Sequence, residues 1–339
     1  MEEILDTIRS WEKQGLDYAV ATVIQTWGSA PRPVGSVMAI SENLDMAGSV
    51  SGGCVEGAVV KEAKSVMESG RPKTLAFGVS NDQAWSVGLT CGGKVTVFLE
   101  PVSRQQALNQ KLFSCLEGHE PCILVSHLQN EKLERSLVFP DGSQMGSTVP
   151  EEVAEEALDA YRSRKSRQAE LGSGNWFIRI YPRPSRLLII GAAHIAVDLV
   201  HLAHYFGFEP IVIDPRGIFT DRTVFSTPPK ELIRDWPAEV LPNYDFDAYT
   251  YAVLLSHDPK IDDQALHLLL DSDIAYIGAL GSSRTHAKRV ARLQKAGFSE
   301  DAIARIHGPI GVNISARSAR EIALSIIAEL IKVKNGGAI

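Results

Sequence analysis

Cysteine is scarce in this sequence. Four cysteines occur in 339 residues, Cys54, Cys91, Cys115 and Cys122, and none belongs to a CxxC pair. Structural zinc sites commonly draw their ligands from such pairs, so the sequence does not favour one. Sparse cysteines without paired spacing are typical of a protein whose thiols stay reduced, and we therefore expect a cytoplasmic protein.

Long apolar runs and an excess of positive charge are missing too. No stretch approaches the roughly 20 apolar residues that cross a membrane, and the first residues lack the basic and apolar pattern of a signal peptide. The net charge is -7, which does not favour nucleic acid as a general partner. We therefore expect no membrane partner and no nucleic-acid partner.

The chain is long enough for about two domains and has an ordinary globular composition, with 45% hydrophobic and 22% charged residues. Prolines punctuate residues 182–185, where we place the boundary between an α/β domain over 1–183 and a Rossmann-like domain over 184–339. In the first domain, apolar periodicity predicts three main helices, over 1–16, 108–116 and 150–171. It also predicts strands over 17–26, 36–40, 74–79, 94–100, 122–128 and 175–181, and a helix that begins after residue 57.

Two turns of the first domain combine a cysteine with paired glycines. Their sequences are Ser51-Gly52-Gly53-Cys54-Val55-Glu56-Gly57 and Cys91-Gly92-Gly93. Paired glycines permit backbone angles and close approaches that a side chain would block. Cys54 is expected in the first turn of a helix, where free N–H groups favour a thiolate. Glu56 opposes this effect, because it places a second anion nearby.

Two interpretations of these turns stay open. In the first, their N–H groups contact an anionic ligand, and Arg32, in the glycine- and proline-rich loop 27–35, supplies positive charge. In the second, they are tight turns around small buried cysteines, and Arg32 is a solvated loop residue. Cys115 and Cys122 have apolar neighbours and no glycines, so we expect them to fill the core or the surface.

The second domain is predicted to be a parallel sheet. An apolar strand over 186–190 leads into a turn at Gly191, a helix follows His194, and the next strand ends at Asp214. This βαβ order is typical of a Rossmann fold, in which the acid binds ribose hydroxyls. Ala193 stands where the fingerprint has its second glycine, and its methyl group crowds a pyrophosphate, so the motif does not favour ordinary NAD binding.

Further polar residues follow later strands of this sheet. His257 and Arg284 come directly after two apolar strands. Ligands of open α/β sheets lie at the carboxyl ends of the strands, so we expect both residues at that edge. The thiols lie in the first domain and this edge in the second, and we therefore expect the ligand to contact both domains.

Together these segments resemble the xanthine dehydrogenase accessory family, XdhC/CoxI, over nearly the whole chain. Besides the two cysteine turns, the resemblance rests on Gly28-Ser29-Ala30-Pro31-Arg32, Asp214-Pro215-Arg216, His257-Asp258-Pro259-Lys260, Gly278-Ala279-Leu280-Gly281-Ser282, Arg284-Thr285-His286 and His307-Gly308-Pro309-Ile310-Gly311. Each motif is modest, and their number and order make the resemblance specific. The departure is Ala193, where the family usually has glycine.

The resemblance implies a molybdenum-cofactor chaperone linked to purine catabolism. Such a protein binds the cofactor and protects it while a cysteine desulfurase installs the terminal sulfur. It then delivers the cofactor to an apo molybdenum hydroxylase of the xanthine dehydrogenase type. The cofactor form, molybdopterin or its dinucleotide, is left open, and we expect a homodimer.

Carried onto this sequence, the family's cofactor site has Cys54 as its leading thiol, a candidate molybdenum ligand, and Cys91 as the second. Arg32, Arg216 or Arg284 would supply charge for the phosphate. No catalytic residue is assigned. The predicted cofactor-binding residues are Arg32, Gly52, Gly53, Cys54, Glu56, Cys91, Gly92, Gly93, Gly191, His194, Asp214, Arg216, His257 and Arg284.

Other functions remain open. The Rossmann half is also compatible with an NAD(P)-dependent oxidoreductase or with one of the subunits of xanthine dehydrogenase. A third possibility is a non-catalytic scaffold between the hydroxylase and the desulfurase. The chain has no cysteine set for an iron–sulfur cluster, which excludes the electron-transfer component of the enzyme.

Overall fold

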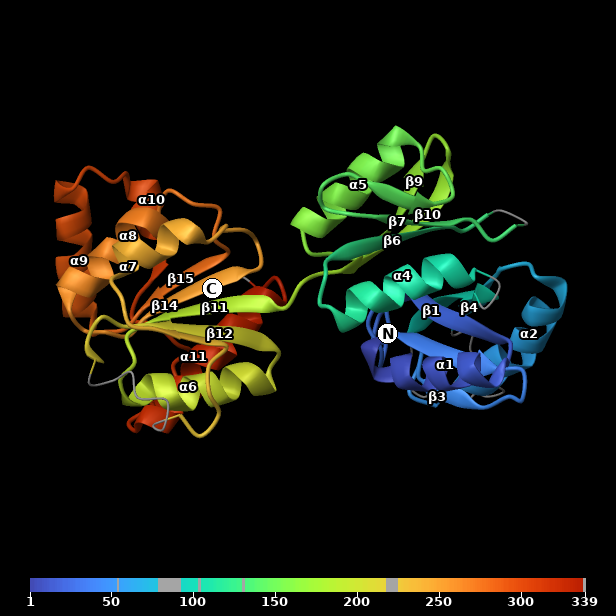
Figure 1. The fold of residues 1–339 in the computed structure, drawn as a ribbon, viewed down its shortest axis with the longest axis horizontal. Coiled ribbons are helices and arrows are strands. Elements are labelled where there is room, and N and C mark those ends of the chain that lie inside the picture. The colour runs from blue at the N-terminus through green and yellow to red at the C-terminus, as the bar shows by residue number, and fades with distance from the viewer. Residues whose placement is uncertain (54, 79–92, 103–104, 130–131, 218–224, 338–339) are drawn as a thin grey trace. The chain divides into compact units, whose positions relative to one another are not determined.

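The computed structural model describes residues 1–53, 55–78, 93–102, 105–129, 132–217 and 225–337. The chain forms two compact units, Met1–Arg183 and Pro184–Ile339 (Figure 1). The first unit is built on antiparallel sheets and the second on a parallel sheet. This confirms the predicted α/β class.

The first sheet of the first unit has the strand order β3-β2-β1-β5-β4. Its strands are β1 (Tyr18–Trp27), β2 (Val37–Ser41), β3 (Met46–Gly48), β4 (Lys73–Phe77) and β5 (Lys94–Glu100), and its helices are α1 (Glu2–Gln14) and α2 (Glu56–Ser69). Apolar side chains of α2 pack on one face of this sheet. Side chains of α1 pack on the other face, where Ile4, Ile8 and Trp11 are buried. The alternating apolar residues of β1 thus supply two cores.

The second sheet has the order β8-β7-β6-β10-β9. It is made of β6 (Cys122–His127), β7 (Arg135–Val138), β8 (Gln144–Gly146), β9 (Arg167–Leu171) and β10 (Gly174–Tyr181). Helix α5 (Glu151–Arg162) covers one face, and α4 (Gln106–Glu117) joins α1 in the core on the other. Both sheets therefore contribute to one shared core, which includes Cys115 and Cys122.

The predicted helix over 150–171 is wrong in its second half. Helix α5 ends at Arg162, Arg164 takes a left-handed φ of 57°, and the chain continues as β9. The charges that suggested one long helical face instead pair across a turn, because Arg167 of β9 contacts Glu156 and Asp159 of α5, each at 2.6 Å. The short strands β7 and β8 were not predicted.

The second unit is a parallel sheet with the order β13-β12-β11-β14-β15-β16. The strands are β11 (Ser185–Ile190), β12 (Phe208–Ile213), β13 (Glu231–Ile233), β14 (Thr250–Leu254), β15 (Tyr276–Ala279) and β16 (Ile306–His307). The strand order reverses direction between β11 and β14, as it does in dinucleotide-binding Rossmann folds. The predicted Rossmann-like architecture is therefore confirmed.

Helices cover both faces of this sheet. Helices α6 (His194–Tyr205) and α11 (Ala319–Lys334) pack on one face. The other face is covered by α7 (Pro237–Val240), α8 (Pro259–Leu269), α9 (Ser283–Lys295) and α10 (Glu300–Ala304). Because both faces are buried, the strands read as continuous apolar runs. In the described residues, no helix is both long and apolar enough to cross a membrane.

Gly191 joins β11 to α6 at the point where the sheet reverses. Its φ is 108°, and a Cβ atom at this position would lie 2.6 Å from the backbone nitrogen of Ser256, which follows β14. Backbone atoms of a neighbouring strand end have little freedom to move away. The turn is therefore closed tightly against the sheet, and this position requires glycine.

We expect Gly191→Ala to destabilise the second unit more than Gly297→Ala. Gly297 also has a positive φ, 96°, but a Cβ there would meet nothing within 4 Å. Both variants carry the left-handed strain, whereas Gly191→Ala adds a backbone clash that we expect to cost about 2 kcal/mol more. Denaturant unfolding followed by circular dichroism measures the difference. Equal losses would contradict the tight packing of this turn.

Candidate functional site

Three glycine-containing motifs of the first unit meet in space. A Cβ on Gly52 would lie 3.9 Å from the Cβ of Pro31, and one on Gly93 would lie 2.7 Å from the carbonyl oxygen of Ser29. The loop after β1, the turn after β3 and the start of β5 therefore pack together. Cys54, Cys91 and Gly92 lie outside the described residues, so the structure does not test their predicted roles.

The carboxylate of Glu56 organises the turn that precedes α2. Its Oε1 accepts hydrogen bonds from the hydroxyl of Ser49 at 2.7 Å and from the N–H groups of Val50 and Ser51 at 3.2 and 2.9 Å. Its Oε2 accepts from the hydroxyl of Ser51 at 2.5 Å and from the N–H of Gly53 at 2.9 Å. The turn is therefore wrapped around an anion that belongs to the chain.

The described N–H groups of the turn have partners within the chain. That of Gly53 donates to Glu56 and that of Gly52 to the hydroxyl of Ser49, both at 2.9 Å. Partial burial works to raise the pKa of Glu56, but hydrogen bonds from Ser51 and Ser49 outweigh it and lower the pKa to about 2. Glu56 therefore stays ionised and holds the turn.

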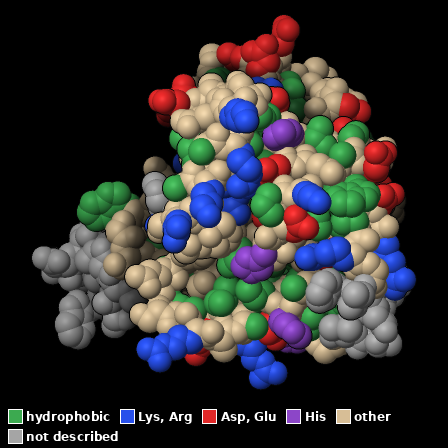
Figure 2. Space-filling model, turned by 90° about the vertical axis from the view of Figure 1, so that its left-hand side faces the viewer, with side chains coloured by type: hydrophobic (Ala, Val, Ile, Leu, Met, Phe, Trp, Pro, Cys, Tyr) green, Lys and Arg blue, Asp and Glu red, His purple; other side chains and the backbone are tan. Residues whose placement is uncertain are grey.

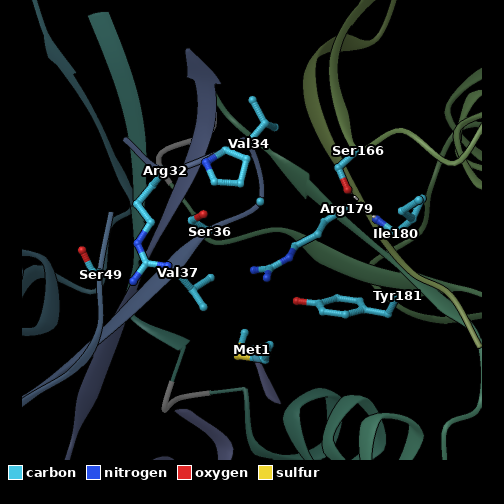
Figure 3. A pocket seen from close by; sticks show the side chains of 12 residues that line it. Met1, Arg32, Val34, Ser36, Val37, Ser49, Ser166, Arg179, Ile180 and Tyr181 are labelled. Carbon is cyan, nitrogen blue, oxygen red and sulfur yellow. Dashed lines mark hydrogen bonds between the residues drawn. The ribbon is translucent and has the colours of Figure 1, made fainter. Parts of the chain in front are cut away.

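A cavity of about 450 Å³ lies beside this turn. Figure 3 shows Arg32 on one side of it and, from β10, Arg179 and Tyr181 on the other, with the guanidinium and the phenol pointing into the space. Its wall is completed by Met1, Pro33, Val34, Gly35, Ser36, Val37, Ser49, Ser166 and Ile180. Since Ser49 also bonds to Glu56, the cavity and the cysteine turn share a wall.

The cavity contains buried polar atoms without partners. Arg179 is 7% exposed and Tyr181 is 8% exposed, and neither the Nη1 of Arg179 nor the hydroxyl of Tyr181 has a hydrogen-bond partner among the described residues. Burial raises the pKa of Tyr181 to about 12, so its hydroxyl keeps its proton and can donate. Buried polar groups are almost always paired, which makes this wall a candidate ligand-binding surface.

Sequence reasoning missed Arg179 and Tyr181. A signal was present, because Phe177, Arg179 and Tyr181 alternate along β10 and so share one face of the strand. A charged residue between two aromatic ones on a buried face is unusual. The alternation alone does not indicate a binding site, because the opposite wall of the cavity comes from the loop that contains Arg32, far away in the sequence.

In the second unit, the predicted ribose ligand Asp214 is fully buried. Its Oδ2 accepts from the N–H of Ala192 at 2.8 Å and from Arg216 at 2.8 Å. Burial works to raise its pKa, but hydrogen bonds from Arg216 and from the N–H of Ala192 lower it. The acid of the fingerprint thus holds the glycine turn and orients Arg216, and it does not present its oxygens to solvent.

The other predicted residues of this unit are spread along the strand ends. His194 begins α6, Arg284 lies in the first turn of α9, and both are exposed. His257 is also exposed and takes a left-handed φ of 60°. Its neighbour Asp258 caps α8 by accepting from the N–H of Lys260 at 2.9 Å. On the face of the molecule that Figure 2 draws, Lys, Arg and His side chains are exposed together with acidic ones.

Metal-ligating side chains do not cluster in the part of the chain that the structure describes. Cys115 and Cys122 are both fully buried, and burial raises the pKa of the Cys122 thiol. A buried thiol with a raised pKa is a poor metal ligand, because metals bind the thiolate. Both cysteines pack in the shared core of the first unit, so we interpret them as core residues.

The fold and the site together define a class of protein. One domain is a Rossmann domain in which the carboxylate of Asp214 accepts from the glycine turn. The other is an α/β domain with a glycine–cysteine turn beside an arginine-lined cavity. The XdhC and CoxI family model matches residues 11–78, and the XdhC Rossmann domain model matches residues 187–330. The chain belongs to this XdhC and CoxI family, as the sequence motifs indicated.

Relatives align along nearly the full chain. A protein of Bacillus subtilis (strain 168), described as a probable subunit of xanthine dehydrogenase, is 26% identical over 93% of this chain and 92% of its own. The molybdenum cofactor insertion chaperone PaoD of Escherichia coli (strain K12) is 28% identical over 94% of this chain and 84% of its own.

Among solved structures, the chain is similar to a crystal structure of a xanthine dehydrogenase from Bacillus halodurans. The TM-score is 0.69 at 27% identity, and the match covers 98% of this chain and 96% of that one.

We expect Glu56→Gln to destabilise the first unit by about 1–2 kcal/mol at neutral pH, because charge-assisted hydrogen bonds are lost at a partly exposed site. The folded-state pKa of Glu56 is about 2, below its ordinary 4.5. Its contribution is therefore complete above pH 4.5 and is lost as the pH falls towards about 2. Urea unfolding at several pH values measures this loss.

The matched control is Glu62→Gln. Glu62 lies on the same helix and pairs with Lys73 on the surface at 2.6 Å. This variant should keep the acid dependence of the wild type, whereas Glu56→Gln should flatten it below pH 4.5. Identical acid profiles for the two variants would show that Glu56 does not hold the turn.

Proposed function

We propose that this protein binds the molybdenum cofactor and delivers it to an apo molybdenum hydroxylase of the xanthine dehydrogenase type. The cofactor would be held while a cysteine desulfurase installs its terminal sulfur. One observation carries the proposal. The family's glycine–cysteine turn lies beside a cavity that contains two arginines and a buried tyrosine hydroxyl. The cofactor is cargo here, and the protein needs no catalytic group of its own.

The chemistry of the cavity fits this cargo. Molybdopterin is a dithiolene that carries an anionic phosphate, so its carrier needs a soft ligand for the metal and donors for the phosphate. The residues next to Cys54 are fixed by Glu56, and Arg32 and Arg179 line the adjoining space. A relative that aligns over 94% of this chain is described as a molybdenum cofactor insertion chaperone, which supports the proposal.

The alternative, an NAD(P)-dependent oxidoreductase, is less well supported. Its motivation is the Rossmann strand order, but the N–H of Ala192 already donates to the buried Asp214. A pyrophosphate would have to compete with that carboxylate for the N–H group of the turn. The hydrogen bonding of this turn therefore gives no support to hydride chemistry on a bound dinucleotide.

We expect Cys54→Ser to retain at least about tenfold less molybdenum cofactor than the wild type, because a metal ligand is lost. The protein would be purified without oxygen from molybdenum-replete cells, and molybdenum and the fluorescent oxidised pterin would be measured per chain. Cys115→Ala is the control, since Cys115 is buried in the core.

Circular dichroism would show that both variants fold. Equal cofactor content in the two variants would exclude a direct role for Cys54. A wild-type protein that contains neither molybdenum nor pterin, and that fails to activate an apo-hydroxylase, would overturn the chaperone function itself.

We expect NADH and NADPH to bind more weakly than about 1 mM, the upper end of ordinary substrate affinities. Isothermal titration calorimetry measures this, with Ala193→Gly as the companion variant. Glycine removes the methyl group that crowds the turn but leaves Asp214 on the N–H of Ala192, so it should not restore tight binding. Micromolar binding by the wild type, together with NAD(P)H-dependent turnover, would favour the oxidoreductase.

A further inference from the structure

Behind the cavity wall of the first unit, buried cations outnumber buried carboxylates around Arg179. Glu100 and Arg135 are 3% and 2% exposed, and the Nε of Arg135 lies 3.6 Å from the Oε1 of Glu100. Arg179 also interacts electrostatically with Glu100. One buried carboxylate therefore faces two buried guanidinium groups, and Arg32 adds a third cation at the cavity wall without a partner among the described residues.

The protonation of Glu100 bears on this balance. Burial raises the pKa of Glu100, while the attraction of Arg135 opposes that shift. Any protonation of Glu100 increases the net positive charge. Taking charges out of water costs on the order of several kcal/mol each unless they are paired. An anion that entered the cavity would offset that cost.

The polar groups of the cavity are mostly donors. The Nη1 of Arg179 and the hydroxyl of Tyr181 have no partner among the described residues, and both point into the space (Figure 3). The hydroxyl of Ser166 accepts from the N–H of Ile180 at 3.1 Å, which leaves its proton directed elsewhere. A ligand that satisfies this set must bring several acceptor oxygens and negative charge.

We propose that Arg32 and Arg179 form the phosphate subsite of this protein, which holds the phosphate ester of the pterin cargo beside the cysteine turn. Guanidinium groups bind phosphate oxygens in a bidentate manner, and two of them with a tyrosine hydroxyl match a tetrahedral oxyanion. Identifying the ester as the cofactor's rests on the proposed function, whereas the oxyanion site rests on the cavity alone.

The wall that the cavity shares with the cysteine turn indicates how a bound pterin would be oriented. Ser49 lines the cavity, and its hydroxyl donates to Glu56 and accepts from the N–H of Gly52. A pterin anchored by its phosphate at the arginines would therefore extend along the turn that contains Cys54. Arg179 and Arg32 act here as positioning residues for the cargo.

Calorimetric titration tests this subsite with defined probes. The probes are 6-hydroxymethylpterin, its phosphate monoester, inorganic phosphate and molybdate. The proteins are the wild type, Arg32→Gln, Arg179→Lys and, as a matched control, Arg162→Gln. Arg162 is an exposed arginine at the end of α5, outside the cavity. Arg179→Lys keeps the charge but removes the bidentate fork, and Arg32→Gln removes the charge of a half-buried loop residue.

We expect the wild type to bind the phosphate monoester at least about tenfold more tightly than the unphosphorylated pterin, with inorganic phosphate competing. Arg32→Gln and Arg179→Lys should each lose about tenfold in affinity for the monoester, and Arg162→Gln should lose nothing. Raising the salt concentration should weaken the binding of the monoester and leave the affinity for the unphosphorylated pterin unchanged.

Three results would overturn the proposal. One is equal affinity of the wild type for the two pterins. Another is wild-type affinity for the monoester in both folded cavity variants. The third is a preference for molybdate or free phosphate over the monoester, which would make the cavity an oxyanion site unrelated to the ester. The proposed function is tested separately by the retained cofactor, so either conclusion can fail while the other stands.

Discussion

The Glu56 carboxylate is the constraint on which the site of the first unit depends. It lies in the first turn of α2, where the N–H groups of a helix start need an acceptor, and it supplies that acceptor from within the chain. The turn therefore has a fixed shape without a ligand. Since the donors of the turn that the structure describes bond within the chain, the fixed positive charge for an external anion lies in the adjoining cavity, with Arg32 and Arg179.

The second unit uses the same device at its own glycine turn. Asp214 closes the turn at Ala192 in the way that Glu56 closes the turn at Gly53. Both turns have the sequence of an anion-binding loop, and in both a carboxylate of the chain takes the position of the anion. Backbone N–H groups must be paired somewhere, so a glycine turn alone is weak evidence for a phosphate site.

Much of the fold could be predicted because it depends on local pattern. The continuous apolar runs around Ile189 and Val253 indicated a buried parallel sheet, and Gly191 marked the turn between strand and helix. The helix predicted over 150–171 failed because its charges looked like one helical face, whereas Arg167 reaches α5 from a neighbouring strand. The cavity could not be predicted, because it joins loop 28–36 to β10, segments that are brought together by the shared core.

The cost of burying Arg179 explains why it points to function. A strand that packs between two apolar neighbours is stabilised by an apolar residue, and a guanidinium there lowers stability unless something else compensates. Glu100 compensates in part, but it also faces Arg135, and the Nη1 of Arg179 still has no partner among the described residues. Proteins keep such local conflicts mainly where a ligand resolves them. We propose that an anionic cargo resolves this one, because its oxygens would accept from Arg179, and that its departure restores the cost of the buried charge.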